Sequence, residues 1–352
     1  METTKEKDRG MMIKCRKKCT RWLRSLPAWL LSALPLFFVS CIDEDLSRCG
    51  VNYIIDYRLE LSASLRLTLD EELTTPAEQE LAAALRQDLA DVMSERAAVM
   101  DLSFFTVDGG SLTQHQTVEP DASSLSMTVY MNRGDYHNIA LAATQKSVGV
   151  DISDPSTYRG IRLAQESGDT IDAHQAAIYM GYELLEMDET SNHFYVPLYM
   201  VNSVPVLVVD PNGSPAETVA AYTRRTASGI VCSDSTFTYD HSAVVRTLRT
   251  DGGGLVAYHS VCFPSTDAST SRAGSDITES EGSLWEMDLY TRMPDGEYVK
   301  NTLYIKDPLR AGEMQVIKVK LDDEGRVVTD NPEVGVSVEL DWKPGGDFDI
   351  EM

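Results

Sequence analysis

The sequence predicts an all-β protein with one minor helix, folded as two antiparallel β-sandwich domains. Three observations carry this prediction. Apolar residues alternate with polar ones in many short runs, which is the pattern of a strand with one buried face. Turns rich in glycine, proline and aspartate separate these runs. With 352 residues, 43% of them apolar, the chain is long enough for two domains with separate cores.

Residues 1–40 predict a signal peptide rather than part of the fold. Their basic stretch precedes an uncharged apolar run over 26–39, which is too short to span a bilayer as a stable helix. The run ends in Phe-Val-Ser-Cys41 and resembles the lipobox of bacterial lipoproteins, in which the cysteine is acylated and becomes the mature N-terminus. We therefore expect a lipoprotein carrying acyl chains such as palmitate at Cys41. An ordinary cleaved signal with an incidental cysteine is the alternative.

Residues 41–50 predict a lipidated tether. The acidic cluster Asp43-Glu44-Asp45 resembles the sequence that directs some Gram-negative lipoproteins to the cell surface, and a solvated linker is the alternative. Several acyl chains on one cysteine anchor a protein stably, because each buried methylene contributes about 0.8 kcal/mol. The expected location is the outer membrane, lipid-anchored and exposed at the cell surface.

Net charge excludes nucleic acid as a partner. The formal charge is −24, and residues 1–40 hold nine Lys and Arg against three Asp and Glu, so the rest of the chain is more acidic still. A surface of that sign repels phosphate backbones.

The first domain, predicted over 51–203, opens with one long strand. Its buried face is formed by alternate residues, and they are Val51, Tyr53, Ile55, Tyr57, Leu59 and Leu61. Leu65, Leu67 and Leu69 continue the same period of two. Further strands are expected over 102–107, 125–131 and 195–201.

One helix is predicted in this domain. Thr75 is its N-cap, Pro76 is the first helical residue and Glu78 closes a capping box. A helical apolar stripe follows, made of Leu81, Leu85, Leu89 and Val92.

The second domain is predicted over 204–352 and consists of strands only. They are expected over 204–209, 229–232, 244–248, 255–263, 284–290, 303–305, 315–321, 326–328 and 334–342. Residues 265–283 include nine Ser and Thr, which predicts a loop. Both Trp285 and Trp342 lie in alternating strands, where a core position is expected.

Three cysteines remain beyond Cys41. Cys232 and Cys262 both lie in strand-like runs, so a disulfide between them and two buried free thiols are both consistent with the sequence. The role of Cys49 is open.

Neither catalytic chemistry nor a cofactor is predicted. The six histidines are scattered without metal-ligand spacing, and the chain has no nucleophile elbow, phosphate-binding loop or dinucleotide fingerprint. We therefore expect no metal site and no enzyme.

The segment from Cys41 to Gly50, followed by the strand 51–61, is similar to the FimB-type fimbrial anchor family. The later order also fits that family: a capped helix, a strand at 102–107, the sequence from Met131 to Tyr136 and a late strand ending at Trp342. The resemblance implies two transthyretin-like sandwiches and an anchor subunit that fixes a fimbrium (pilus) to the outer membrane and limits its length. Its implied partners are fimbrial stalk subunits, and a role in cell adhesion follows.

The resemblance also implies strand addition, in which a stalk subunit that has lost its first strand accepts an extended segment from a neighbour. An anchor is expected to retain its first strand. The last six residues alternate apolar and acidic side chains, with Phe348, Ile350 and Met352 on one side. Our hypothesis is that this tail, 347–352, donates a strand. A final strand folded onto its own domain and a frayed terminus are the alternatives. A surface glycan-binding lipoprotein of a nutrient-uptake system is the second functional hypothesis.

Overall fold

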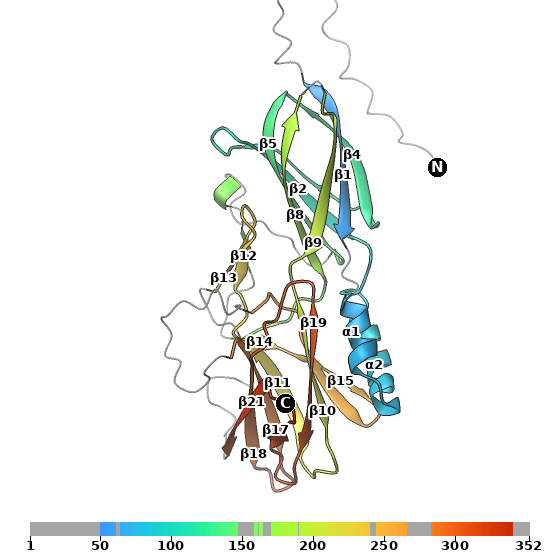
Figure 1. The fold of residues 1–352 in the computed structure, drawn as a ribbon, viewed down its shortest axis with the longest axis vertical. Helices are drawn as coiled ribbons and strands as arrows, with labels where there is room; N and C mark the ends of the chain where they lie inside the picture. The colour runs from blue at the N-terminus through green and yellow to red at the C-terminus, as the bar shows by residue number, and fades with distance from the viewer. Residues whose placement is uncertain are drawn as a thin grey trace, which may run out of the picture. The chain divides into compact units, whose positions relative to one another are not determined.

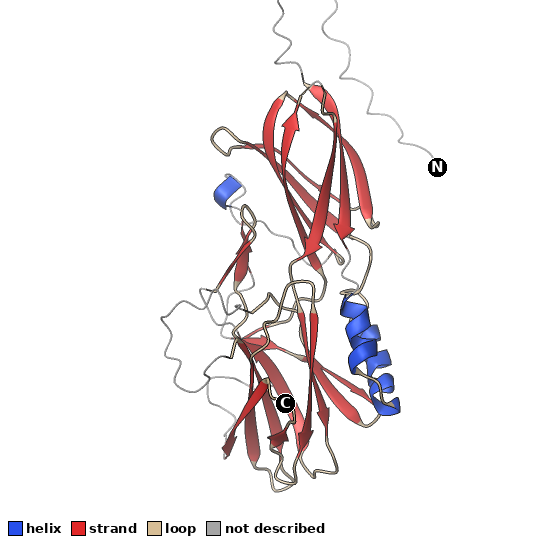
Figure 2. Cartoon of the chain, in the orientation of Figure 1, coloured by secondary structure: helices blue, strands red, loops and turns tan. Residues whose placement is uncertain are grey.

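Strands dominate the structure, as the sequence predicts (Figure 2). The computed structural model describes residues 50–60, 64–146, 158–160, 162–164, 170–188, 190–239, 244–265 and 283–340. Within these ranges the two α-helices are α1 (Ser64–Glu72) and α2 (Pro76–Asp88). The prediction of an all-β protein is confirmed.

A seven-stranded sheet is built from residues of the first half of the chain (Figure 1). Its order is β3 (Leu112–Val118), β2 (Val99–Thr106), β5 (Gly134–Ala143), β8 (Ile178–Met187), β9 (His193–Met200), β1 (Val51–Glu60) and β4 (Ser124–Met131). Side chains from β1, β2, β4, β5, β8 and β9 share one buried apolar cluster. The sheet therefore surrounds its own core.

Two further sheets are built mainly from the second half. The five-stranded sheet has the order β15 (Leu248–Gly252), β16 (Leu255–His259), β10 (Val204–Asp210), β19 (Met314–Leu321) and β20 (Val327–Val328). The six-stranded sheet has the order β21 (Val334–Leu340), β18 (Tyr298–Ile305), β17 (Trp285–Arg292), β11 (Glu217–Arg224), β14 (Val244–Arg246) and β7 (Thr170–Ile171). A small sheet joins β13 (Thr236–Thr238), β12 (Gly229–Val231) and β6 (Arg162–Ala164), and a 3-10 turn covers Tyr158–Gly160.

Strand β10 is buried on both faces. Val206 and Val208 belong to the cluster that includes the helices, whereas Leu207 and Val209 belong to the cluster between the five- and six-stranded sheets. The five-stranded sheet is therefore the middle of three layers. A strand covered on both sides is expected to be apolar throughout, which is what its sequence shows.

The predicted helix is confirmed as α2, with the capping box between Thr75 and Glu78. Glu78 also pairs with Lys318 of β19, with 3.1 Å between carboxylate oxygen and ammonium nitrogen. At the β15–β16 hairpin, a Cβ on Gly253 would come 2.2 Å from the Ala77 carbonyl oxygen. Both contacts place α2 against the five-stranded sheet.

The period of two expected at Leu65, Leu67 and Leu69 is wrong, because these residues lie in α1. Leu65 and Leu69 are buried one helical turn apart, and Leu67 is 52% exposed. A run of three alternating leucines fits a strand and a short helix equally well, and packing against a sheet decides between them.

The sheets are mixed rather than purely antiparallel. Strand β1 pairs parallel with β9, and β10 pairs parallel with β19. Alternation within a strand reports which face is buried and carries no information on the direction of the neighbouring strand. The predicted strand 244–248 is divided between β14 and β15. Seven strands that the sequence did not predict are present, and they are β3, β5, β6, β7, β8, β11 and β13.

The division into domains at residue 203 stays a prediction. Residues from Gly50 onward form one compact unit. The helices come from the predicted first domain but pack on a sheet of the second, and β6 and β7 likewise join strands from beyond residue 203.

Candidate functional site

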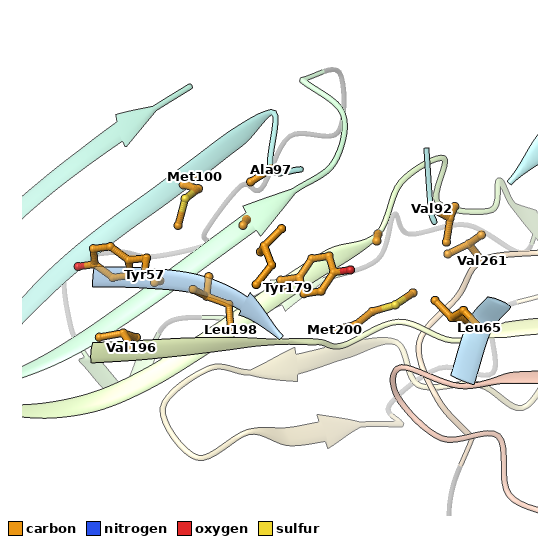
Figure 3. Close-up of a cluster of buried hydrophobic side chains, with 14 of the residues drawn as sticks. Tyr57, Leu65, Val92, Ala97, Met100, Tyr179, Val196, Leu198, Met200 and Val261 are labelled. Carbon is orange, nitrogen blue, oxygen red and sulfur yellow. The ribbon is translucent and has the colours of Figure 1, made fainter. Parts of the chain in front are cut away.

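The first strand of the fold is the candidate site, because it joins the predicted tether to the core. Tyr53, Ile55 and Tyr57 are 0% exposed and Leu59 is 3% exposed. Figure 3 shows Tyr57 beside Val196 and Leu198 of β9, inside the seven-stranded sheet. Four of the six predicted inward-facing residues are therefore core residues. Val51 is half-buried, and Leu61 lies outside the described residues.

Strand β1 has neighbours on both sides. It pairs antiparallel with β4, from Val51 opposite Met131 to Arg58 opposite Ser124. It pairs parallel with β9, from Ile54 beside His193 to Glu60 beside Tyr199. Its main-chain donors and acceptors are thus shared between two ladders, as in an interior strand.

The inward-facing phenols of β1 stabilise the core rather than acting as acids. Burial raises the pKa of Tyr57 and of Tyr53 above the usual value for a tyrosine. Both side chains are therefore neutral at physiological pH.

Loss of β1 would open the seven-stranded sheet between β9 and β4. The gap would expose the Val196 and Leu198 side chains together with two unpaired strand edges. Such a groove has the geometry that an extended segment of another chain fills by strand addition. In this protein the groove is filled by the chain's own β1.

A second feature lies at the C-terminal edge of the six-stranded sheet. Strand β21 pairs with β18 and has no neighbour on its other side among the described strands. Its core-facing row becomes steadily more exposed: Val334 is 7% exposed, Val338 is 37% and Leu340 is 61%. An edge strand with exposed apolar side chains is a site for pairing with another strand. The predicted donor residues Phe348, Ile350 and Met352 follow it and lie outside the described residues, as does Trp342.

The two cysteines considered for a disulfide are both buried and unbridged in the structure. Cys232 belongs to an apolar cluster that the small sheet shares with β2, β5 and β8, and Cys262 belongs to the cluster between the five- and six-stranded sheets. Burial raises the pKa of each thiol to about 12, so both stay protonated and unreactive. Cys41 and Cys49 lie outside the described residues.

Within the described residues no group of three or more His, Cys, Asp or Glu side chains could hold a metal ion. The same part of the chain contains no helix that is long and apolar enough to cross a membrane. Trp285 is 0% exposed, and its indole nitrogen donates to the Asp307 carbonyl oxygen at 2.8 Å. It is a core residue, as predicted.

One group of surface residues was not predicted as a site. Tyr130, Tyr195 and Tyr199 are 67%, 49% and 60% exposed on the outer face of β4 and β9. The signal was present in the sequence, because Tyr195 and Tyr199 fall on the polar side of an alternating run. A tyrosine on that side is exposed even though its ring is apolar.

No family model and no curated protein sequence matches the chain. The chain is similar in structure to the fimbrial anchor protein Mfa2 from Porphyromonas gingivalis, with 13% identity and a TM-score of 0.46 over 83% of this chain and 99% of that one. It is similar to the C-terminally truncated tip fimbrial protein Mfa3 from the same organism, with 11% identity and a TM-score of 0.43 over 83% and 100% of the two chains. A proposed adhesin from Bacteroides thetaiotaomicron is 9% identical, with a TM-score of 0.49 over 82% and 96%.

Proposed function

We propose that this protein is a lipid-anchored fimbrial anchor subunit, which attaches a fimbrial stalk to the outer membrane and limits its length. The observation that carries the proposal is the position of β1. It is an interior strand of the seven-stranded sheet, and the lipobox-like cysteine precedes it by only nine intervening residues. Pulling force on the body of the protein would therefore pass directly into a fully hydrogen-bonded strand.

Retention of β1 follows from this arrangement. Cleavage within the strand, for instance after Arg58, would separate Cys41 from the body of the protein. It would also leave β4 and β9 without the partner they share. An anchor that keeps its first strand has a filled groove and cannot accept a strand there, so its contact with the stalk must lie elsewhere.

The C-terminal end supplies that contact in our proposal. Strand β21 presents the apolar side chains of Val338 and Leu340 at a sheet edge that no other described strand covers, and the sequence continues through Pro344 into the alternating tail 347–352. We propose that the tail donates a strand to the first stalk subunit, with Phe348, Ile350 and Met352 filling its pockets.

Truncation after Pro344 tests the contact. We expect cells carrying the truncated protein to release their fimbriae into the medium, because the main-chain ladder and the apolar anchors are both lost. The measurement is the fraction of stalk protein retained on sheared cells. Undiminished retention would contradict donation by the tail.

A matched pair of tail variants separates side-chain recognition from mere length. Replacing Phe348, Ile350 and Met352 by Ser should reduce retention nearly as far as truncation does. Replacing Asp347, Asp349 and Glu351 by Ser should leave most of it, because these side chains lie on the opposite side of the extended tail. Equal effects of the two triple variants would contradict pocket filling by the apolar row.

A further inference from the structure

Three exposed tyrosines lie on the outer face of the sheet, on β4 and β9, which are the two neighbours of β1. We call this surface the tyrosine face and define it by Tyr130, Tyr195 and Tyr199, with Ile54 between them. Ile54 is 41% exposed, and each tyrosine is about half exposed or more. Exposed rings gathered on one sheet face are the kind of surface feature that marks a binding site.

The tyrosines are evenly spaced along the strand direction. Tyr130 lies opposite Asn52 of β1. Tyr195 and Tyr199 lie beside Asp56 and Glu60 of the same strand. Successive tyrosines are therefore four residue levels apart along β1, or about 13 Å, so that the row extends for about 26 Å in this direction and crosses β1 from the β4 side to the β9 side. A row of that length suits a linear ligand that runs obliquely across β1 from Tyr130 of β4 to Tyr199 of β9.

Neighbouring contacts restrict the rings. Tyr195 donates its hydroxyl to the Glu60 carboxylate across the strand pair. The Tyr130 ring lies against the backbone of Gly50, where an added Cβ would come 2.5 Å from ring carbon Cε1. A ring that is already restricted loses little conformational entropy on binding.

Polar groups lie between the rings. The His193 Nε2 atom is 2.6 Å from the Asp56 carboxylate, and Ser126 also donates to Asp56. These hydrogen bonds hold the pKa of Asp56 below its usual value, so the carboxylate stays charged. A protein partner covering this face would have to desolvate Asp56, Glu60 and Arg58 together, which costs free energy. A ligand rich in hydroxyl groups can instead donate hydrogen bonds to the carboxylates.

The charge of the tyrosine face distinguishes neutral from charged ligands among those rich in hydroxyl groups. Two carboxylates, Asp56 and Glu60, flank one guanidinium, Arg58, on a chain with a formal charge of −24. Sulfated, phosphorylated or uronic-acid polymers would be repelled by this surface. The ligand that fits both the rings and the charge is neutral.

We propose that the tyrosine face binds a neutral polysaccharide, with its sugar rings stacked on the tyrosines and its hydroxyl groups bonded to the carboxylates between them. This binding site goes beyond the anchoring function and does not depend on it, because the face lies on the opposite side of β1 from the core.

Affinity electrophoresis of the full chain in detergent tests the proposal. The gels contain one of four neutral polymers, dextran, mannan, galactan or a linear β-glucan, or else dextran sulfate. We expect at least one neutral polymer to retard the protein and dextran sulfate to have no effect. The double variant Tyr195→Ala and Tyr199→Ala should weaken that binding by at least about tenfold. Phenylalanine at both positions should keep most of it, and Tyr239→Ala, an exposed tyrosine elsewhere, should leave it unchanged.

Failure of every neutral polymer to retard the protein would overturn the proposal. So would retardation that the double alanine variant leaves intact, or binding to dextran sulfate alone. Sedimentation of the same variants identifies a homotypic interface: a dimer that Tyr195→Ala and Tyr199→Ala abolish would assign the face to a second copy of this chain. Stalk retention on cells should be normal in the double variant, so the outcome is independent of the anchoring proposal.

Discussion

At the scale of single residues, the exposure of a side chain in β1 depends on its position in the strand and not on its residue type. Ile54 and Ile55 are chemically identical neighbours, yet Ile54 is 41% exposed and Ile55 is 0% exposed. The alternation of a strand places them on opposite faces of the seven-stranded sheet. Their free-energy contributions should differ accordingly.

Alanine substitution at these two positions measures that difference. Ile55→Ala should lower the free energy of unfolding by about 3 kcal/mol, because it removes buried methyl groups and leaves a cavity. The matched change Ile54→Ala should lie within about 0.5 kcal/mol of the parent, since its side chain is already in water. Urea unfolding followed by circular dichroism provides the comparison, and equal losses would place β1 outside the core.

Buried histidines give stability a dependence on pH. His259 is 1% exposed, and within the described residues neither of its ring nitrogens has a hydrogen-bond partner. Burial lowers its pKa, with the Asp88 carboxylate opposing the shift, and burial lowers the pKa of His174 to about 4. Below about pH 6.5 the unfolded chain therefore binds more protons than the folded one. The stability that these two neutral histidines contribute is fully present above about pH 6.5 and decreases as the pH falls towards 5.

The variant His259→Gln checks this assignment. It should flatten the pH dependence of the urea midpoint between pH 7.5 and pH 5.5, whatever it does to the midpoint itself. The parent protein, measured over the same pH range, serves as the control. Identical slopes for the parent and His259→Gln would show that this ring does not contribute.

At the scale of elements, the contact between α2 and the β15–β16 hairpin depends on glycine. Gly253 and its neighbour Gly254 both have positive φ angles, of 61° and 79°. An added Cβ on Gly253 would overlap the Ala77 backbone of α2, whereas one on Gly254 would meet nothing within 4 Å. The two positions share backbone strain and differ in packing.

Alanine at each glycine separates these effects. Gly254→Ala should cost about 1 kcal/mol, the strain of a left-handed residue with a side chain. Gly253→Ala should cost about 1–3 kcal/mol more, because the hairpin or the helix has to move away. Thermal unfolding of the two variants gives the comparison. Equal losses would mean that the hairpin does not lie against α2.

The sequence predicted individual strands and helices better than it predicted which strands pair with each other. Alternation in β1 and the capping signals of α2 were sufficient, because each depends on residues close in the chain. The parallel pairings of β1 with β9 and of β10 with β19 could not be predicted, since they join residues more than 100 positions apart. The same distinction applies to the candidate sites. The buried positions of Tyr53, Ile55, Tyr57 and Leu59 were predicted, because one strand determines them. The tyrosine face was not predicted, because it is formed where three strands distant in the sequence come together.

At the scale of the whole molecule, the proposed membrane attachment and the proposed stalk contact lie at opposite ends of the sequence. The N-terminal strand is an interior strand that is shared by two ladders. The C-terminal described strand lies at a sheet edge with Leu340 61% exposed. The first arrangement resists extraction, and the second is open to pairing with another chain.

The most direct test of this account is mass spectrometry of the protein's N-terminal peptide, isolated from outer membranes of cells that carry fimbriae. The account predicts an acylated peptide that begins at Cys41 and runs uncut through β1 to Arg58. An unmodified residue 41, or a mature N-terminus beyond β1, would contradict it.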